Sequence, residues 1–239
     1  GPLLGSLISG LMYRSIGENV AIILATSIVI VGAIISWIVF LDIIPIENGS
    51  RVVFDWITSG ALNSAWAVKI DSLVKVMLVV VLSVSSLVHL YSIGYMRNDH
   101  NWNSEEKYKA RFFSYLSFFT FAMLVLVSAD NLLQLFFGWE GVGVASYLLI
   151  GFYFKKPSAN NAAMKAFIVN RVGDFGFLVG IFIIFAYAGS IDFSDIFIFF
   201  ATENQAKLAG FKIEEIICFF LFVGAMGKSA QIFLHTWLP

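Results

Sequence analysis

Long apolar runs constrain this chain more than any other feature. All but the short first run are long enough to cross the ~30 Å hydrocarbon core of a bilayer as a helix. Of the 239 residues, 59% are apolar and 13% are charged. The charged share is about half that of a water-soluble domain, so a soluble fold is excluded. The runs are Pro2–Tyr13, Val20–Leu41, Ile70–Met96, Phe112–Ser128, Asn131–Phe154, Ala162–Ala188 and Ile213–Leu234.

Hydrocarbon cannot hydrogen-bond to backbone amides, so a spanning segment is either a helix or part of a closed barrel. The alternation of apolar and polar residues that barrel strands need is absent. The sequence therefore predicts an all-α, polytopic transmembrane helix bundle of about seven spans, with residues 1–239 forming a single transmembrane domain. The short Ser128–Asn131 connection predicts an antiparallel helical hairpin, whereas Asp42–Lys69 and Gly189–Lys212 are expected along the membrane surface.

The composition also excludes several kinds of site. Cys218 is the only cysteine, and the three histidines are not clustered, so neither a disulfide nor a zinc or Fe–S site is predicted. The net charge is −1, from 15 basic and 16 acidic side chains, so the chain has no basic field to attract nucleic acid. We therefore expect no metal and no cofactor in this chain, and the lipid bilayer rather than a nucleic acid around it.

The distribution of Lys and Arg predicts the orientation. The first, third and fifth connections must share one membrane face, and that face carries more basic residues than the other. By the positive-inside rule the richer face is cytoplasmic, or matrix-side in a mitochondrion, and the N-terminus lies outside. The richer face carries Arg14, Arg97, Lys107, Lys109, Arg111, Lys155 and Lys156, and the other carries Arg51, Lys69, Lys207 and Lys212.

Ionisable residues in the middle of the spans are the candidates for function. A charge at the bilayer centre costs roughly 2.5–3.5 kcal/mol on insertion scales and is usually retained for function. Glu140 lies nine positions after Asn131, about 14 Å along its helix. Asp174 and Lys228 reach a similar depth in the next two spans. Arg171 precedes Asp174 by three positions, on the same helical face.

Two interpretations of these charges stay open. In the structural interpretation, Arg171 and Asp174 form a local ion pair, and Glu140 and Lys228 form an inter-helix pair that only holds the bundle together. In the functional interpretation, Glu140 and Lys228 form a protonation switch, because burial favours the neutral form of each group and proximity favours the charged forms. Lysine suits this role because it can lose its proton when desolvated, which arginine does not.

Other residues near the charges support narrower predictions. Gly224 and Gly227 precede Lys228 closely, and such glycines weaken a helix where a discontinuous transport helix needs it weak. His89 is expected to be a hydrogen-bonded packing residue rather than a proton relay. The roles of two further residues stay open, namely Lys165 and His235.

Four segments, in order along nearly the whole chain, carry a family resemblance. They are Tyr91-Ser92-Ile93-Gly94-Tyr95-Met96, the stretch from Asp130 to Gly143 (DNLLQLFFGWEGVG), Asn170-Arg171-Val172-Gly173-Asp174-Phe175-Gly176, and Gly227-Lys228-Ser229-Ala230-Gln231. Together they resemble the antiporter-like subunit 5 (chain L) family of respiratory NADH:quinone oxidoreductase, complex I. Members of that family continue through a second, inverted set of helices, further path lysines and a long lateral helix. The resemblance therefore implies the N-terminal part of such a subunit, an incomplete antiporter-like fold, and we expect a fragment or one product of a split gene.

The resemblance also implies a function. It implies a proton-translocating subunit of an enzyme, a translocase that couples electron transfer from NADH to quinone to proton pumping. In such subunits the glutamate that Glu140 matches modulates the lysine that Lys228 matches, and Asp174 with Arg171 lies close to that path. NADH, flavin, Fe–S clusters and quinone belong to other subunits, and this chain carries no redox centre.

The implied partners are other membrane-arm subunits of complex I. The implied location is that of a multi-pass integral membrane protein, in a bacterial inner membrane rather than a mitochondrial one. A second hypothesis is the large subunit of a proton/sodium antiporter, which shares the glutamate and the lysine but has no redox partner. A third is a structural membrane anchor whose buried charges only pair with one another.

Overall fold

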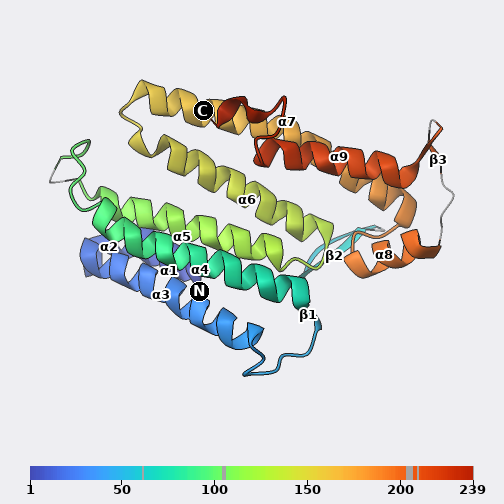
Figure 1. The fold of residues 1–239 in the computed structure, drawn as a ribbon, viewed down its shortest axis with the longest axis horizontal. Coiled ribbons are helices and arrows are strands. Elements are labelled where there is room, and N and C mark those ends of the chain that lie inside the picture. Colours follow the sequence, from blue (N-terminus) through green and yellow to red (C-terminus); the bar gives the residue numbers. More distant parts are fainter. Residues whose placement is uncertain (61, 104–105, 203–206, 209, 239) are drawn as a thin grey trace.

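The computed structural model describes residues 1–60, 62–103, 106–202, 207–208 and 210–238. In this part of the chain, five helices are long and apolar enough to cross a membrane. They lie side by side, with their connections gathered at two ends (Figure 1). The prediction of an all-α, polytopic bundle is confirmed. The five helices are α3 (Glu18–Phe40), α4 (Ser72–Tyr95), α5 (Tyr108–Val127), α6 (Leu132–Ile150, followed by the 3-10 turn Gly151–Tyr153) and α7 (Pro157–Ala188).

The first and last predicted spans are less regular. The first consists of α1 (Pro2–Leu7), a π-helical turn (Ile8–Met12) and α2 (Tyr13–Ile16). The last, α9 (Ile213–Lys228), has 16 residues, a length of about 24 Å. It ends at Lys228 instead of continuing to Leu234 as predicted, and the backbone then turns, with left-handed φ angles at Ala230 and Phe233. A 3-10 turn (His235–Trp237) follows.

A β-hairpin replaces much of the first segment that was expected along the membrane surface. Strands β1 (Gly49–Ser59) and β2 (Leu62–Ile70) pair antiparallel. The rings of Trp56 and Trp66 pack edge-on against Phe137 of α6, at centroid distances of 5.6 and 5.3 Å. The second such segment contains α8 (Phe193–Thr202) and two short strands, β3 (Lys207–Leu208) and β4 (Phe211–Lys212), and part of it lies outside the described residues.

The start of α6 is fixed by polar contacts that agree with the predicted helical hairpin. The side chain of Asn131 caps α6 by accepting a hydrogen bond from the Gln134 N–H at 2.8 Å. The amide of Asn131 donates to the Ala65 carbonyl of β2 at 2.8 Å, and Gln134 accepts from the Ala67 N–H at 3.0 Å. Short polar links therefore hold the turn between α5 and α6 against the β-hairpin.

His89 of α4 is a packing residue, as predicted. Its side chain is fully buried, with Nδ1 2.8 Å from the Ser85 carbonyl oxygen and Nε2 3.1 Å from the Ser117 hydroxyl of α5. The three connections predicted to share a face, α2–α3, α4–α5 and α6–α7, do lie at one end of the bundle, opposite the β-hairpin and α8 (Figure 1). Which compartment that end faces stays a prediction.

Candidate functional site

The site begins where α7 and α9 cross at two glycines. A Cβ added to Gly173 would lie 3.0 Å from the Gly227 Cα, and one added to Gly227 would lie 3.2 Å from the Gly173 Cα. The two backbones are therefore in contact, which side chains at these positions would prevent. Each glycine is followed by a charged residue, so the crossing brings Asp174 and Lys228 together, with Nζ 3.7 Å from Oδ1.

Asp174 is the shared acceptor of the site. Its side chain is 4% exposed, and Oδ1 accepts a hydrogen bond of 2.6 Å from the indole N–H of Trp139 on α6. The Arg171 guanidinium lies 3.9 Å from Oδ2. At 3.7 Å the Lys228 ammonium is charge-paired with Asp174 but too distant for a hydrogen bond.

Glu140 contacts the other charged residues of the site through Arg171. The Arg171 guanidinium donates a hydrogen bond to Glu140 Oε2, forming an ion pair between α7 and α6. The guanidinium also lies over the Phe167 ring, 4.6 Å from its centroid. The four charged side chains therefore alternate in sign, in the order Glu140, Arg171, Asp174 and Lys228, and we call them the charge chain.

The pairing within the charge chain differs from the sequence prediction. Glu140 and Lys228 form no direct ion pair among the described residues. The predicted local pair of Arg171 and Asp174 is present, but its 3.9 Å distance is longer than the contact that Arg171 makes with Glu140. The reason is geometric: the glycine crossing places Lys228 beside Asp174, and the longer arginine side chain reaches α6.

Each end of the charge chain has a polar atom without a hydrogen-bond partner among the described residues. Within the described part of the chain, Glu140 Oε1 and Lys228 Nζ are buried and have no hydrogen-bond partner. Gly143 of α6 leaves room for the ammonium, since a Cβ there would lie 2.5 Å from Nζ. A buried ionisable atom without a partner is costly in a membrane protein, which makes Glu140 and Lys228 candidates for function. Both ends are chemically able to exchange a proton.

Trp139 belongs to the site, although the sequence prediction did not select it. Its ring stacks on Phe177 of α7 at a centroid distance of 4.8 Å, and the Lys228 ammonium lies 5.8 Å from the ring centroid. With its hydrogen bond to Asp174, it contacts two members of the charge chain. An indole N–H in the middle of an apolar helix needs an acceptor, and this requirement is the signal that identifies Trp139.

The residues whose roles stayed open make no ion pair with the charge chain in the described part of the structure. Lys165 on α7 and His235 after α9 are both exposed on the described surface. A further lysine within the spans, Lys75 of α4, forms an ion pair with Asp42 at 3.0 Å.

Comparisons with known proteins show the family of the chain. Residues 56–113 match the family model described as NADH-Ubiquinone oxidoreductase (complex I), chain 5 N-terminus, and residues 129–239 match the model described as NADH:quinone oxidoreductase/Mrp antiporter, TM. The NADH-quinone oxidoreductase subunit L of Rhodobacter capsulatus is 57% identical over 242 residues, covering 100% of this chain and 34% of that protein. The chain belongs to the chain 5 (subunit L) family of NADH-quinone oxidoreductase. The resemblance predicted from the sequence is confirmed.

A second relative and a solved structure show how much of a longer protein the chain covers. The NADH-ubiquinone oxidoreductase chain 5 of Chondrus crispus is 50% identical, covering 100% of this chain and 35% of that protein. The chain therefore spans about a third of the length of the curated relatives it matches. A solved structure, the Mrp complex from Dietzia sp. DQ12-45-1b, shares the fold with a TM-score of 0.78 at 21% identity, covering 100% of this chain and 24% of that one. As a subunit L family member with five spanning helices in its described part, the chain is a multi-pass membrane protein.

Proposed function

We propose that this chain is part of a proton-translocating membrane subunit of NADH:quinone oxidoreductase, in which electron transfer from NADH to quinone drives proton pumping. The names of its relatives and its membership of the subunit L family support this proposal. The observation that carries it is the charge chain, which joins α6, α7 and α9 through alternating charges.

The charge chain can couple two proton-exchanging ends. If Glu140 takes up a proton, Arg171 loses its partner and is drawn toward Asp174, its other carboxylate. Asp174 then attracts Lys228 less strongly, and the lysine releases its proton. Two unit charges at 4 Å interact by about 4 kcal/mol at an effective dielectric constant of about 20. That energy corresponds to about a thousandfold change in a protonation equilibrium.

Each residue has a distinct part in this proposal. Lys228 carries the proton, because a lysine can be neutral in a desolvated site. Arg171 keeps its charge and transmits the state of Glu140. Asp174 holds both cations, and Trp139 fixes the orientation of the Asp174 carboxylate.

The proposal extends to partners and location. The other membrane-arm subunits of complex I are the partners, and NADH, flavin, Fe–S clusters and quinone are bound by other subunits. The membrane is the bacterial inner membrane, on the basis of the bacterial relatives.

The test is a substitution of Lys228 with a matched control. The complete complex with Lys228→Met, reconstituted in proteoliposomes, should still assemble and oxidise NADH. Its acidification per NADH oxidised should be strongly reduced. Lys75→Met is the control, because the Lys75 side chain is 13% exposed against 14% for Lys228 and lies outside the charge chain. Unchanged acidification in Lys228→Met, or an equal loss in both variants, would refute the assignment of Lys228.

The proton/sodium antiporter without a redox partner is the second candidate. The family model shared with Mrp antiporters and the fold of the Mrp complex favour it. Co-purification of the chain with NADH dehydrogenase activity, and inhibition of its proton flux by rotenone-type inhibitors, would support the complex I function. Proton flux without either would support the antiporter.

A further inference from the structure

Arg111 has an unusual environment for a charged residue. It lies in the first turn of α5, and its guanidinium carbon is 4.8 Å from the ring centroids of Trp102 and Phe154 and 5.2 Å from that of Phe152. Its Nη2 atom is buried and has no hydrogen-bond partner among the described residues. Among the described residues no carboxylate lies within 4.0 Å of it: Glu106, with which it does interact electrostatically, is farther away and is paired with Lys155. Such a cation is expected to meet an anion, because an unpaired buried charge is costly.

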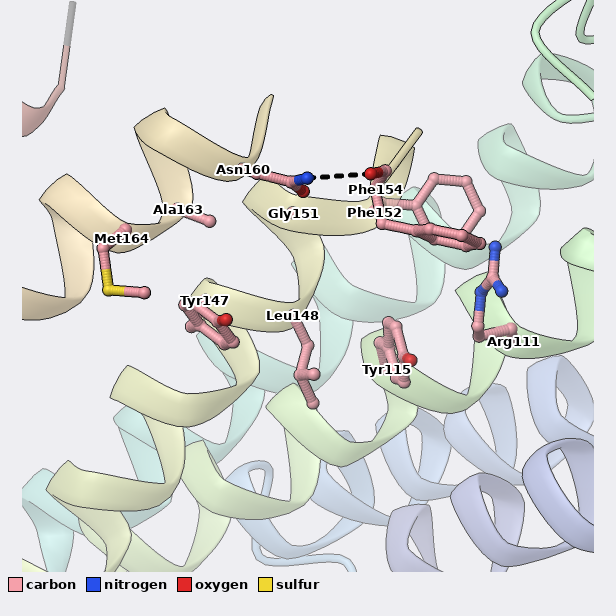
Figure 2. A pocket seen from close by; sticks show the side chains of 10 residues that line it. All are labelled: Arg111, Tyr115, Tyr147, Leu148, Gly151, Phe152, Phe154, Asn160, Ala163 and Met164. Atoms are coloured by element: carbon pink, nitrogen blue, oxygen red, sulfur yellow. Dashed lines mark hydrogen bonds between the residues drawn. The ribbon is translucent and has the colours of Figure 1, made fainter. Parts of the chain in front are cut away.

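The guanidinium borders a cavity of about 270 Å³ between α5, α6 and α7. Figure 2 shows Arg111 with the rings of Phe152 and Phe154 at one end, and Met164 at the other. Between them lie the side chains of Tyr115, Tyr147 and Leu148. The cavity therefore has one cationic end and a longer apolar part, which is the shape of a site for an amphiphile.

The location of the cavity fits a lipid headgroup. Arg111 stands in the first turn of α5, Phe152 and Phe154 follow the end of α6, and Asn160 stands in the first turn of α7, where its amide donates to the Phe154 carbonyl at 2.8 Å. These helix ends share the face richer in basic residues, at the depth where aromatic side chains meet the headgroups. Basic pockets between transmembrane helices on that face bind acidic lipid headgroups.

We propose that this cavity, the Arg111 cavity, binds an acidic membrane phospholipid. A phosphodiester oxygen accepts a hydrogen bond from the edge of the Arg111 guanidinium that borders the cavity, and an acyl chain lies along Leu148 toward Met164. Met164 is 50% exposed, so the apolar end opens at the surface of the helix bundle. Charge complementarity selects an anion, and the apolar walls select a lipid over a free phosphate ion. The proposal does not depend on the charge chain.

The experiment uses the complete membrane complex that contains this chain, in nanodiscs of phosphatidylcholine with a phosphatidylglycerol that carries a photoactivatable group in one acyl chain. Peptide mapping after illumination should find the label in residues 147–164. Arg111→Gln should reduce that labelling about tenfold, because the charge-assisted hydrogen bond is lost. Lys109→Gln is the matched control: it removes a charge from the same turn of α5 but from a residue outside the cavity lining, and should leave the labelling unchanged.

Further measurements keep the result unambiguous. The labelling is compared only for complex that migrates as assembled on a native gel. If Arg111→Gln does not assemble, Met164→Trp, which fills the apolar end and keeps the cation, should reduce the labelling instead. Equal labelling of Arg111→Gln and the unmodified complex would overturn the proposal. So would displacement of the label by excess inorganic phosphate, which indicates a free anion, or absence of label from residues 147–164, which indicates that protein covers the cavity.

Discussion

Replacing Asp174 with asparagine tests the pairing at the centre of the charge chain. Asparagine keeps an oxygen that accepts the Trp139 N–H, now 2.6 Å away, but removes the negative charge. The Asp174 side chain is 4% exposed, and the Lys228 ammonium lies 3.7 Å away, so the substitution leaves a buried cation without its counter-charge. Breaking a buried pair in this way costs about 3–5 kcal/mol. A loss of that size is a large share of the stability of a domain.

Lys228 should be the cation left without a counter-charge, because Arg171 keeps Glu140 as a partner. We therefore expect Asp174→Asn to reduce the amount of assembled complex. The double variant with Lys228→Met should restore assembly, since it removes the orphaned cation. The double variant with Arg171→Gln should not, since it leaves Glu140 unpaired and Lys228 still orphaned.

Native-gel quantification of the assembled complex, together with its NADH oxidation rate, measures these differences. Recovery of assembly with Arg171→Gln but not with Lys228→Met would refute the pairing, because it would make Arg171 the principal partner of Asp174. Normal assembly of Asp174→Asn with lost proton translocation would show instead that Asp174 itself carries the proton.

Three further substitutions test other contacts. Trp139→Phe removes the N–H that reaches Asp174, and the loss of about 1.5–3 kcal/mol of charge-assisted hydrogen bonding should lower acidification per NADH while the complex still assembles. Gly143→Ala places a carbon 2.5 Å from the Lys228 ammonium, so the lysine must move, and pumping should slow with assembly unchanged on a native gel. Asp192→Asn removes a carboxyl whose pKa is raised by burial and by two neighbouring aspartates. Its ionised form destabilises the fold, so the thermal midpoint should exceed that of the unmodified protein at about pH 7, and the difference should vanish below about pH 3, where the carboxyl is protonated in both states.

Matched variants separate these effects from general disruption. Gly141→Ala is the control for Gly143→Ala, because its added carbon would meet the Ala122 methyl at 3.0 Å rather than a charged group. An equal loss of pumping in both glycine variants would contradict the contact with Lys228. Undiminished pumping in Trp139→Phe would contradict a positioning role for the indole. A midpoint difference in Asp192→Asn that persists in full below about pH 3 would contradict the electrostatic origin of its effect.

Five of the seven predicted spans are long helices in the structure, because each is a continuous apolar run. Glu140 stands in the ninth position of α6 and Lys228 ends α9, with side chains 20% and 14% exposed. The pairing could not be predicted, because it depends on how the helices rotate and where they cross. Gly173 and Gly227 set that crossing, and two glycines in separate spans do not reveal that they touch.

The hairpin formed by β1 and β2 was missed for a related reason. The sequence analysis expects Asp42–Lys69 along the membrane surface, where aromatic residues such as its tryptophans are common. In the structure Trp56 and Trp66 pack against Phe137, a contact with a residue more than 70 positions away in the sequence. The segment itself carries residues that favour strands, such as Val52, Val53 and Phe54, whereas its packing against α6 is a tertiary contact that the sequence does not reveal.

The central claim is that the charge chain changes its protonation when the complex turns over. The most direct measurement is the infrared difference spectrum between the NADH-reduced and oxidised complex, recorded for the unmodified protein, Glu140→Gln and Lys228→Met. The account predicts a carboxyl band that Glu140→Gln abolishes and that Lys228→Met alters, because the four charges respond together. A difference spectrum that neither substitution changes would contradict it.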